Sequence, residues 1–120
     1  MHRLLIASMM LWMIALAACS GDGTTTITID PVSDQQDFRI EAPAGTVRAS
    51  LEVQGESSHP FSLFVSDGLF TSQFNFAAGP IEDVKSFDWY DSPLLLNYVP
   101  DTAVTVTGQL TIACSFQTGN

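Results

Sequence analysis

The stretch "TVRASLEV", residues 46–53, alternates strictly between polar and apolar side chains. On an extended strand, successive side chains point to opposite faces. Val47, Ala49, Leu51 and Val53 are therefore predicted to share one face, and the polar residues between them the other. Such a pattern favours a strand with one face in a hydrophobic core and one face in water.

The same alternation recurs along the chain and leaves little sign of helical periodicity. In "GQLTIACSF", residues 108–116, the apolar positions include Cys114, which is predicted to face the core together with Leu110, Ile112 and Phe116. Further strands are expected at Thr25–Asp30, Asp37–Ala42, Phe61–Ser66, Leu69–Phe76, Val84–Tyr90, Leu94–Val99 and Ala103–Thr107.

Turn signals separate these segments at short intervals. Asp67-Gly68 lies between two apolar runs and favours the type I′ turn of a tight hairpin. About eight short strands spaced in this way indicate a sandwich or a barrel. We predict an all-β domain, a single antiparallel β-sandwich. The other turn segments, rich in glycine, proline or aspartate, are Ala42–Gly45, Gly55–Pro60, Ala77–Pro80 and Val99–Thr102.

The order "DFRIEAPAGTVRASLEV", residues 37–53, resembles small bacterial extracellular sandwich domains of the pre-peptidase C-terminal type. In that family a strand with a phenylalanine leads through a Pro-Ala-Gly turn into an alternating strand. The family's later Asp-x-Asp-Leu strand is replaced here by "PFSLFV", residues 60–65. The resemblance supports the sandwich fold and transfers no functional residue.

The N-terminus, "MHRLLIASMMLWMIALAAC", has the layout of a secretory signal peptide. His2 and Arg3 form a short basic start, and an apolar run follows from Leu4 to Leu16. This run is shorter than the roughly 20 apolar residues that a spanning helix needs. We therefore expect residues 1–18 to be a cleaved signal peptide.

Leu16-Ala17-Ala18-Cys19 resembles the lipobox of bacterial lipoproteins. The resemblance implies that Leu16, Ala17 and Ala18 direct cleavage, and that the Cys19 thiol carries a diacylglyceryl anchor. It also implies the outer membrane, facing the periplasm, because Ser20 replaces the aspartate that retains such proteins at the inner membrane. The alternatives are an ordinary signal with an incidental Cys19, or an uncleaved anchor helix. The expected organisation is then residues 1–18 signal peptide, 19–25 lipidated cysteine and short tether, and 26–120 β-sandwich domain.

The charge balance excludes one class of partner. The chain has 13 acidic and 4 basic residues, for a net charge of −9. Losing Arg3 with the signal leaves 3 basic against 13 acidic residues, or −10. A nucleic-acid interface needs clustered Lys and Arg, so none is expected. Metal cations and basic proteins, including a protein partner in the envelope, are the partners that this charge favours.

Few residues suit catalysis. His59 is the only histidine after the signal, and the chain has no G-x-S-x-G motif. One histidine and one cysteine are too few for a zinc site. Cys114, left without a partner if Cys19 is lipidated, is expected to be a buried free thiol. The sequence thus predicts a non-enzymatic binding or interaction module with no catalytic residue and no cofactor other than calcium.

Two ligand-binding alternatives remain, with different residues. Calcium prefers several converging carboxylates, and Asp30, Asp34 and Asp37 fall in one connection between predicted strands. Carbohydrate is favoured by the segment "SFDWYDSP", residues 86–93. There Asp88, Tyr90 and Asp91 are expected to be exposed and Trp89 to lie in the core. Phe64 faces away from Phe61, Leu63 and Val65, so it is either covered by a loop or part of an apolar contact patch.

Overall fold

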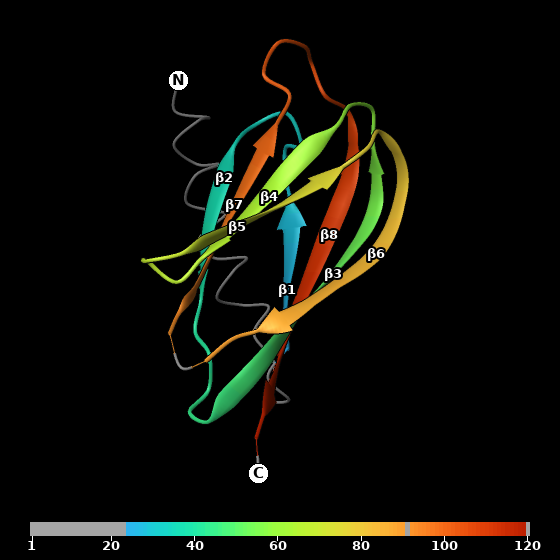
Figure 1. The fold of residues 1–120 in the computed structure, drawn as a ribbon. Coiled ribbons are helices and arrows are strands. Elements are labelled where there is room, and N and C mark those ends of the chain that lie inside the picture. Colours follow the sequence, from blue (N-terminus) through green and yellow to red (C-terminus); the bar gives the residue numbers. More distant parts are fainter. Residues whose placement is uncertain (1–23, 91, 120) are drawn as a thin grey trace, which may run out of the picture.

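The computed structural model describes residues 24–90 and 92–119. Within them the chain forms eight strands, which build two four-stranded antiparallel sheets packed face to face (Figure 1). The predicted all-β antiparallel sandwich is confirmed. The described part of the chain has no helix long and apolar enough to cross a membrane.

Each sheet takes strands from both halves of the chain. The first sheet has the order β1 (Thr24–Ile29), β8 (Gly108–Thr118), β3 (Thr46–Ser57) and β6 (Gly79–Asp88). The second sheet has the order β2 (Gln36–Ile40), β7 (Leu94–Pro100), β4 (Phe61–Ser66) and β5 (Thr71–Phe76). The free edges are therefore β1 and β6 in the first sheet, and β2 and β5 in the second.

The core lies between the sheets and follows the predicted alternation. Leu51 and Val53 of β3 lie opposite Cys114 and Ile112 of β8, and all four side chains are fully buried. Leu63 of β4 and its neighbours on β7 close the core from the second sheet. Phe116 is only partly buried, because it lies near the end of β8.

Val47 does not face the core as predicted. The pairing of β3 with β8 shifts register between Thr46 and Arg48, which breaks the alternation at this position. Val47 is 40% exposed as a result. Thr46 is buried instead, and its hydroxyl donates a hydrogen bond of 2.6 Å to the Pro43 carbonyl.

The hairpin between β4 and β5 forms, but not through the predicted type I′ turn. That turn needs positive φ at two residues, and within the described chain only glycines have positive φ. The connection instead takes four residues, 67–70. Asp67 Oδ1 accepts hydrogen bonds of 2.8 Å from the backbone N–H groups of Phe70 and of Leu69, and these bonds lower the Asp67 pKa. β5 therefore starts at Thr71, and Leu69 and Phe70 are 86% and 77% exposed.

Two other predicted segments differ from the structure. Residues Ala103–Thr107 form no strand, because the Asp101 carboxylate accepts a hydrogen bond of 3.0 Å from the Ala103 N–H and turns the chain there. The strand expected over Val84–Tyr90 starts earlier, at Gly79, and ends at Asp88. Pairing with the long strand β3 extends β6 into the segment that its Gly-Pro content marks as a turn.

Two glycines allow β3 and β8 to approach closely. Gly55 and Gly108 have φ values of +131° and +135°, which other residues rarely adopt. A Cβ at Gly55 would lie 1.9 Å from the Gln109 carbonyl oxygen, and one at Gly108 would lie 2.1 Å from that of Glu56. Only glycine fits at either position.

Tyr98 of β7 connects the second sheet to the loop after β1. Its side chain is fully buried, and its hydroxyl donates a hydrogen bond of 2.5 Å to the Val32 carbonyl. The ring also packs against Phe61 of β4, with 5.4 Å between the ring centres. This bond satisfies a polar hydroxyl that burial would otherwise destabilise.

Replacing Tyr98 by phenylalanine should lower the free energy of unfolding by about 1–3 kcal/mol, because the Val32 carbonyl loses its buried donor. Urea denaturation followed by circular dichroism measures this change. Tyr90→Phe is the matched control, because Tyr90 is 62% exposed, and it should change stability by less than about 0.5 kcal/mol. Equal stabilities of the two variants would show that the buried bond contributes nothing.

Candidate functional site

The predicted lipidation site lies outside the described residues. This holds for Cys19, for Leu16, Ala17 and Ala18 before it, and for Asp91 of the proposed carbohydrate set. The predictions made for them remain predictions. The other predicted site residues can be placed.

The three aspartates of the calcium hypothesis do not converge. Asp30 follows β1, Asp34 lies in the next loop, and the Asp37 carboxylate accepts a hydrogen bond from Asn97 Nδ2 on β7. The Gln36 side chain holds this loop, because its Nε2 donates to the carbonyls of Pro31 and Asp34 at 2.7 and 3.2 Å. Among the described residues, no group of three His, Cys, Asp or Glu side chains has a geometry that could hold a metal ion. The structure thus gives the calcium hypothesis no site.

Asp88 ends β6, and Tyr90 follows it two residues later. Asp88 pairs loosely with Arg48 of β3, at 3.7 Å, and Tyr90 projects into solvent. Trp89 is partly buried against the core rather than enclosed in it. Its Nε1 donates a hydrogen bond of 2.8 Å to the Ser92 carbonyl, and its ring meets Phe87 edge-on at 5.9 Å.

His59 lies beside a set of hydrogen bonds that joins two loops. The Ser58 hydroxyl lies 2.9 Å from His59 Nδ1, and the same oxygen accepts a hydrogen bond of 2.9 Å from the Thr107 N–H. The Ser58 N–H in turn donates to the Thr107 carbonyl at 2.9 Å. These bonds fasten the β3–β4 connection to the segment before β8, so they explain Ser58 without a nucleophilic role.

The outer face of the second sheet gathers polar side chains around one aromatic ring. Phe64, at the centre of β4, lies opposite Gln73 of β5 and Asn97 of β7. Two residues further along, on the same face, Ser62 of β4 lies opposite Asn75 of β5. We call these five residues the outer amide face.

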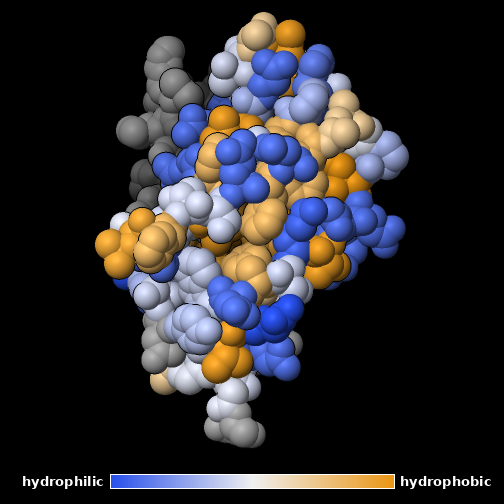
Figure 2. Space-filling model, in the orientation of Figure 1, coloured by the Kyte–Doolittle hydropathy of each residue, from blue (hydrophilic) through white to orange (hydrophobic). Residues whose placement is uncertain are grey.

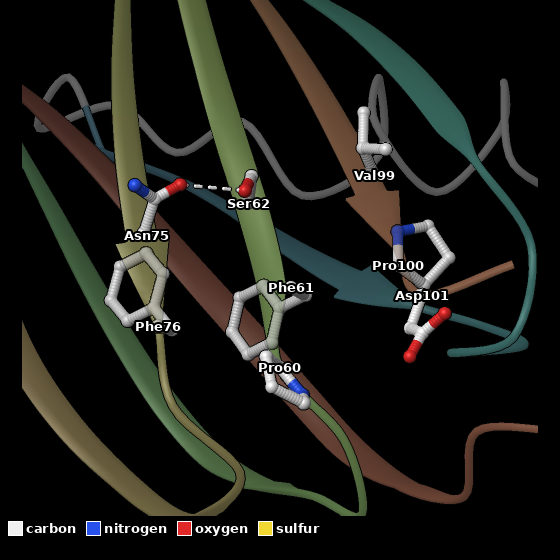
Figure 3. Close-up of a pocket in the computed structure, with 8 residues that line it drawn as sticks. All are labelled: Pro60, Phe61, Ser62, Asn75, Phe76, Val99, Pro100 and Asp101. Carbon is white, nitrogen blue, oxygen red and sulfur yellow. Dashed lines mark hydrogen bonds between the residues drawn. The ribbon is translucent and has the colours of Figure 1, made fainter. Parts of the chain in front are cut away.

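Hydrogen bonds within the outer amide face hold its side chains in place. Asn75 Oδ1 accepts a bond of 2.7 Å from the Ser62 hydroxyl and one of 2.9 Å from Gln73 Nε2. Figure 3 shows the Asn75 nitrogen turned away from Ser62. Asn97 is held by its bond to Asp37. The face therefore presents preset amide donors and acceptors beside the half-buried ring of Phe64.

A pocket of about 290 Å³ adjoins the outer amide face where β4 begins and β5 and β7 end. Ser62 and Asn75 belong to both the face and the pocket wall (Figure 3). Phe61 and Phe76 also line the pocket, and their rings stack in parallel at 4.9 Å, but both side chains are buried in the core. The volume is at the lower end of the range for small-molecule sites, about 300–1,000 Å³. The remaining lining residues are Pro60, Val99, Pro100 and Asp101.

The sequence signalled only part of this site. Phe64 was conspicuous because its position faces away from the other apolar residues of its strand. The amides come from three strands that are distant in the chain, and only the register of the sheet brings them together. Predicting them would have required the pairing of β4 with both β5 and β7.

No protein-family model matches the chain, and no curated protein matches it either. Solved structures share its fold. A part of tripeptidyl peptidase 2 matches with a TM-score of 0.56 and 14% identity over 77% of this chain, which spans only 9% of that protein. PliG, a periplasmic inhibitor of g-type lysozyme from Aeromonas hydrophila, matches with a TM-score of 0.53 and 18% identity, covering 81% of this chain and 89% of PliG.

The unliganded CBM1 of BiXyn10A is a further structural match. Its TM-score is 0.50 at 14% identity, and the match covers 78% of this chain and 70% of that one. At these identities the comparisons establish the fold and nothing finer.

Two buried groups have raised pKa values. Burial raises the pKa of the Cys114 thiol from 9 to about 12, and that of the Tyr98 hydroxyl from 10 to about 12. Cys114 is a free, fully buried thiol, as predicted. Because the thiolate is the reactive form, Cys114 is inert in the folded chain.

We expect alkaline conditions to destabilise the fold. Both pKa values are higher in the folded state, so their contribution to stability is complete below pH 9 and is lost as the pH rises towards 12. The thiol alone accounts for at most about 4 kcal/mol, at about 1.4 kcal/mol per pKa unit. Urea midpoints measured from pH 7 to pH 11.5 test this expectation.

Cys114→Ala is the variant that isolates the thiol. It should be less stable at pH 7, because it leaves a small cavity, but its decline should begin about one pH unit later, when tyrosine ionises. A variant whose stability falls in parallel with that of the native chain from pH 9 would show that the thiol does not contribute.

Proposed function

We propose that this protein is a lipid-anchored, non-enzymatic binding module of the bacterial envelope, and that its ligand is a carbohydrate bound on the outer amide face. The observation that carries the proposal is the hydrogen-bonded group of Ser62, Gln73 and Asn75 beside Phe64, adjoining a pocket of about 290 Å³. The lipid anchor rests on the lipobox resemblance at Cys19.

The chemistry of the face suits a sugar ring. A pyranose has an apolar face of C–H groups and a rim of hydroxyls that both donate and accept hydrogen bonds. The partly exposed Phe64 ring offers apolar contact, while Gln73, Asn75 and Asn97 offer amide groups that do both.

The charge distribution favours a neutral ligand. The chain carries a net charge of −9, yet the outer amide face contains no charged residue. The charges nearest to it on β2 are already paired: Asp37 with the Asn97 amide, and Arg39 with Glu41 at 2.7 Å. A charged ligand would find no partner of opposite sign within the face.

The structural neighbours support binding over catalysis. PliG is named as an inhibitor, and BiXyn10A CBM1 carries the usual abbreviation for a carbohydrate-binding module. The peptidase match, by contrast, spans 9% of that protein. Within the described residues, the buried Cys114 and the structurally engaged Ser58 offer no activated nucleophile.

The proposed anchor would hold the domain close to its membrane. β1 begins at Thr24, so four residues, 20–23, separate Cys19 from the first strand. Four extended residues span at most roughly 14 Å. A module held at this distance samples only ligands near the membrane surface.

Cys19→Ser should release the protein from the membrane, because serine cannot form the thioether to the lipid. Fractionation of bacteria that express the full chain measures this directly, and metabolic labelling with a radioactive fatty acid should mark only the native form. Cys114→Ser, which changes the buried thiol, is the control and should remain in the membrane fraction. Fatty-acid labelling of the Cys19→Ser form would contradict the lipid anchor.

The lipidated protein in mild detergent should bind one or more neutral glycans on an array. Phe64→Ala should weaken that binding at least tenfold, a loss of about 1.4 kcal/mol, because the apolar contact disappears. Val84→Ala is the matched control, because Val84 is exposed on the other sheet, and it should bind as the native chain does. Circular dichroism should show both variants folded.

Two results would contradict the carbohydrate assignment. One is an array on which no neutral glycan binds. The other is a folded Phe64→Ala variant that binds its glycan with native affinity.

A further inference from the structure

β5 has a free edge whose backbone hydrogen-bonding groups point outward. The second sheet ends at β5, which pairs only with β4 among the described strands. The Asp67 N–H donates to the Phe70 carbonyl at 3.3 Å, which identifies these two residues as a hydrogen-bonded pair of the β4–β5 hairpin. Hydrogen-bonded pairs alternate in antiparallel strands, so the peptide groups of Ser72, Phe74 and Phe76 face β4. Those of Thr71, Gln73 and Asn75 face the open edge.

β5 also lacks the features that usually block such an edge. Its sequence, TSQFNF, has no charged residue and no proline. The edge strand β6 carries Pro80 and charged side chains, and the edge strand β2 has five residues, two of them charged. β1 is uncharged as well, but unlike β5 it contains no aromatic residue.

Beside β5 lies an aromatic strip, formed by Phe74, Phe87 and Trp89, that β5 only partly covers. Phe74 of β5 stacks on Phe87 of β6 at 5.7 Å, and Phe87 contacts Trp89 at 5.9 Å. All three side chains are only partly buried. Figure 2 shows hydrophobic side chains exposed among polar ones on this front of the molecule, where β5 and β6 lie (Figure 1). Lys85 lies over the rings of Phe76 and Phe74, at 5.6 and 5.9 Å.

Two exposed apolar side chains lie just before the start of β5. Leu69 and Phe70, which directly precede Thr71, are 86% and 77% exposed. Exposed large apolar residues are common singly, but these two are consecutive and lead into an open edge strand. The three features together form a site for one more strand.

We propose that β5 binds an extended, basic segment of a partner protein, which adds to the second sheet as a fifth strand. Backbone bonds to Thr71, Gln73 and Asn75 would give affinity, as in other cases of strand addition. Alternate side chains of the segment cover Phe74 and Phe87. This site uses the backbone groups of Gln73 and Asn75, whereas the outer amide face uses their side chains, so the proposal does not rest on the carbohydrate assignment.

Charge selects the occupant. β6, which carries Phe87, also carries Glu82, Asp83 and Asp88 against the single Lys85. Asp83 pairs with that lysine at 3.1 Å, and Asp88 lies 3.7 Å from Arg48. The net charge of −9 on the whole chain attracts basic side chains. A second copy of this chain is disfavoured, because it would bring another net charge of −9 and another acidic β6 to the same place.

The test uses an octapeptide of alternating lysine and valine, added to the full chain in detergent. Trp89 belongs to the aromatic strip and reports binding by its fluorescence. The substitution Trp12→Phe makes Trp89 the only tryptophan of the chain. The expected result is a saturable blue shift with the lysine–valine peptide, and binding at least tenfold weaker with a glutamate–valine peptide. No shift, or equal binding of the two peptides, overturns the proposal.

Thr71→Pro separates strand addition from general attraction. The Thr71 N–H faces the open edge, so proline removes that donor without removing a β4–β5 bond. Peptide binding should weaken at least tenfold, whereas Thr71→Ala, which keeps the N–H, should bind as the native chain does. Native affinity in Thr71→Pro overturns the proposal.

A second variant keeps the test decisive if Thr71→Pro does not fold. Ser72 is exposed on the same side of β5 as Phe74. Ser72→Lys therefore places a cation where the added strand must pack. Ser72→Lys should abolish the blue shift of Trp89 fluorescence, and Thr28→Lys on β1 should leave it unchanged. Equal effects of Ser72→Lys and Thr28→Lys on peptide binding overturn the proposal. So does sedimentation that shows a dimer of the native chain which Ser72→Lys dissociates, because the occupant would then be a second copy.

Discussion

The ladder between β3 and β8 holds the sandwich together. It runs antiparallel from Arg48 to Ser57 and places the inner side chains of both strands opposite the second sheet. β6 and β1 are each added to one side of this pair. The ladder in turn depends on close approach of the two backbones at Gly55 and Gly108, where any Cβ would collide with a carbonyl oxygen. The core forms because these two long strands stay in register.

The alternating pattern was enough to predict the fold class, since a period of two specifies strands with one buried face. It did not reveal local backbone events. Val47 follows the apolar pattern but lies beside a register shift, and Ala103–Thr107 alternates but is turned by the Asp101 carboxylate. The first difference depends on a shift in strand register and the second on a single hydrogen bond. Neither can be read from the hydropathy of the residues.

The candidate site was less predictable than the fold. The predicted residues Asp30, Asp34 and Asp37 are neighbours in sequence, but their side chains do not converge. The outer amide face draws on β4, β5 and β7, which contribute residues up to 35 positions apart, from Ser62 to Asn97. Only Phe64 gave a signal, because it breaks the pattern of its own strand. Sites assembled by register remain hidden until the strand order is known.

The buried thiol of Cys114 has a consequence for quality control. In an oxidising compartment, an accessible thiol enters mixed disulfides with other proteins. The folded chain keeps Cys114 between the sheets and protonated, so it takes no part in this exchange. An unfolded copy exposes the same sulfur and can be trapped. The residue thus makes folded and unfolded chains chemically distinguishable by their reactivity towards thiols and disulfides.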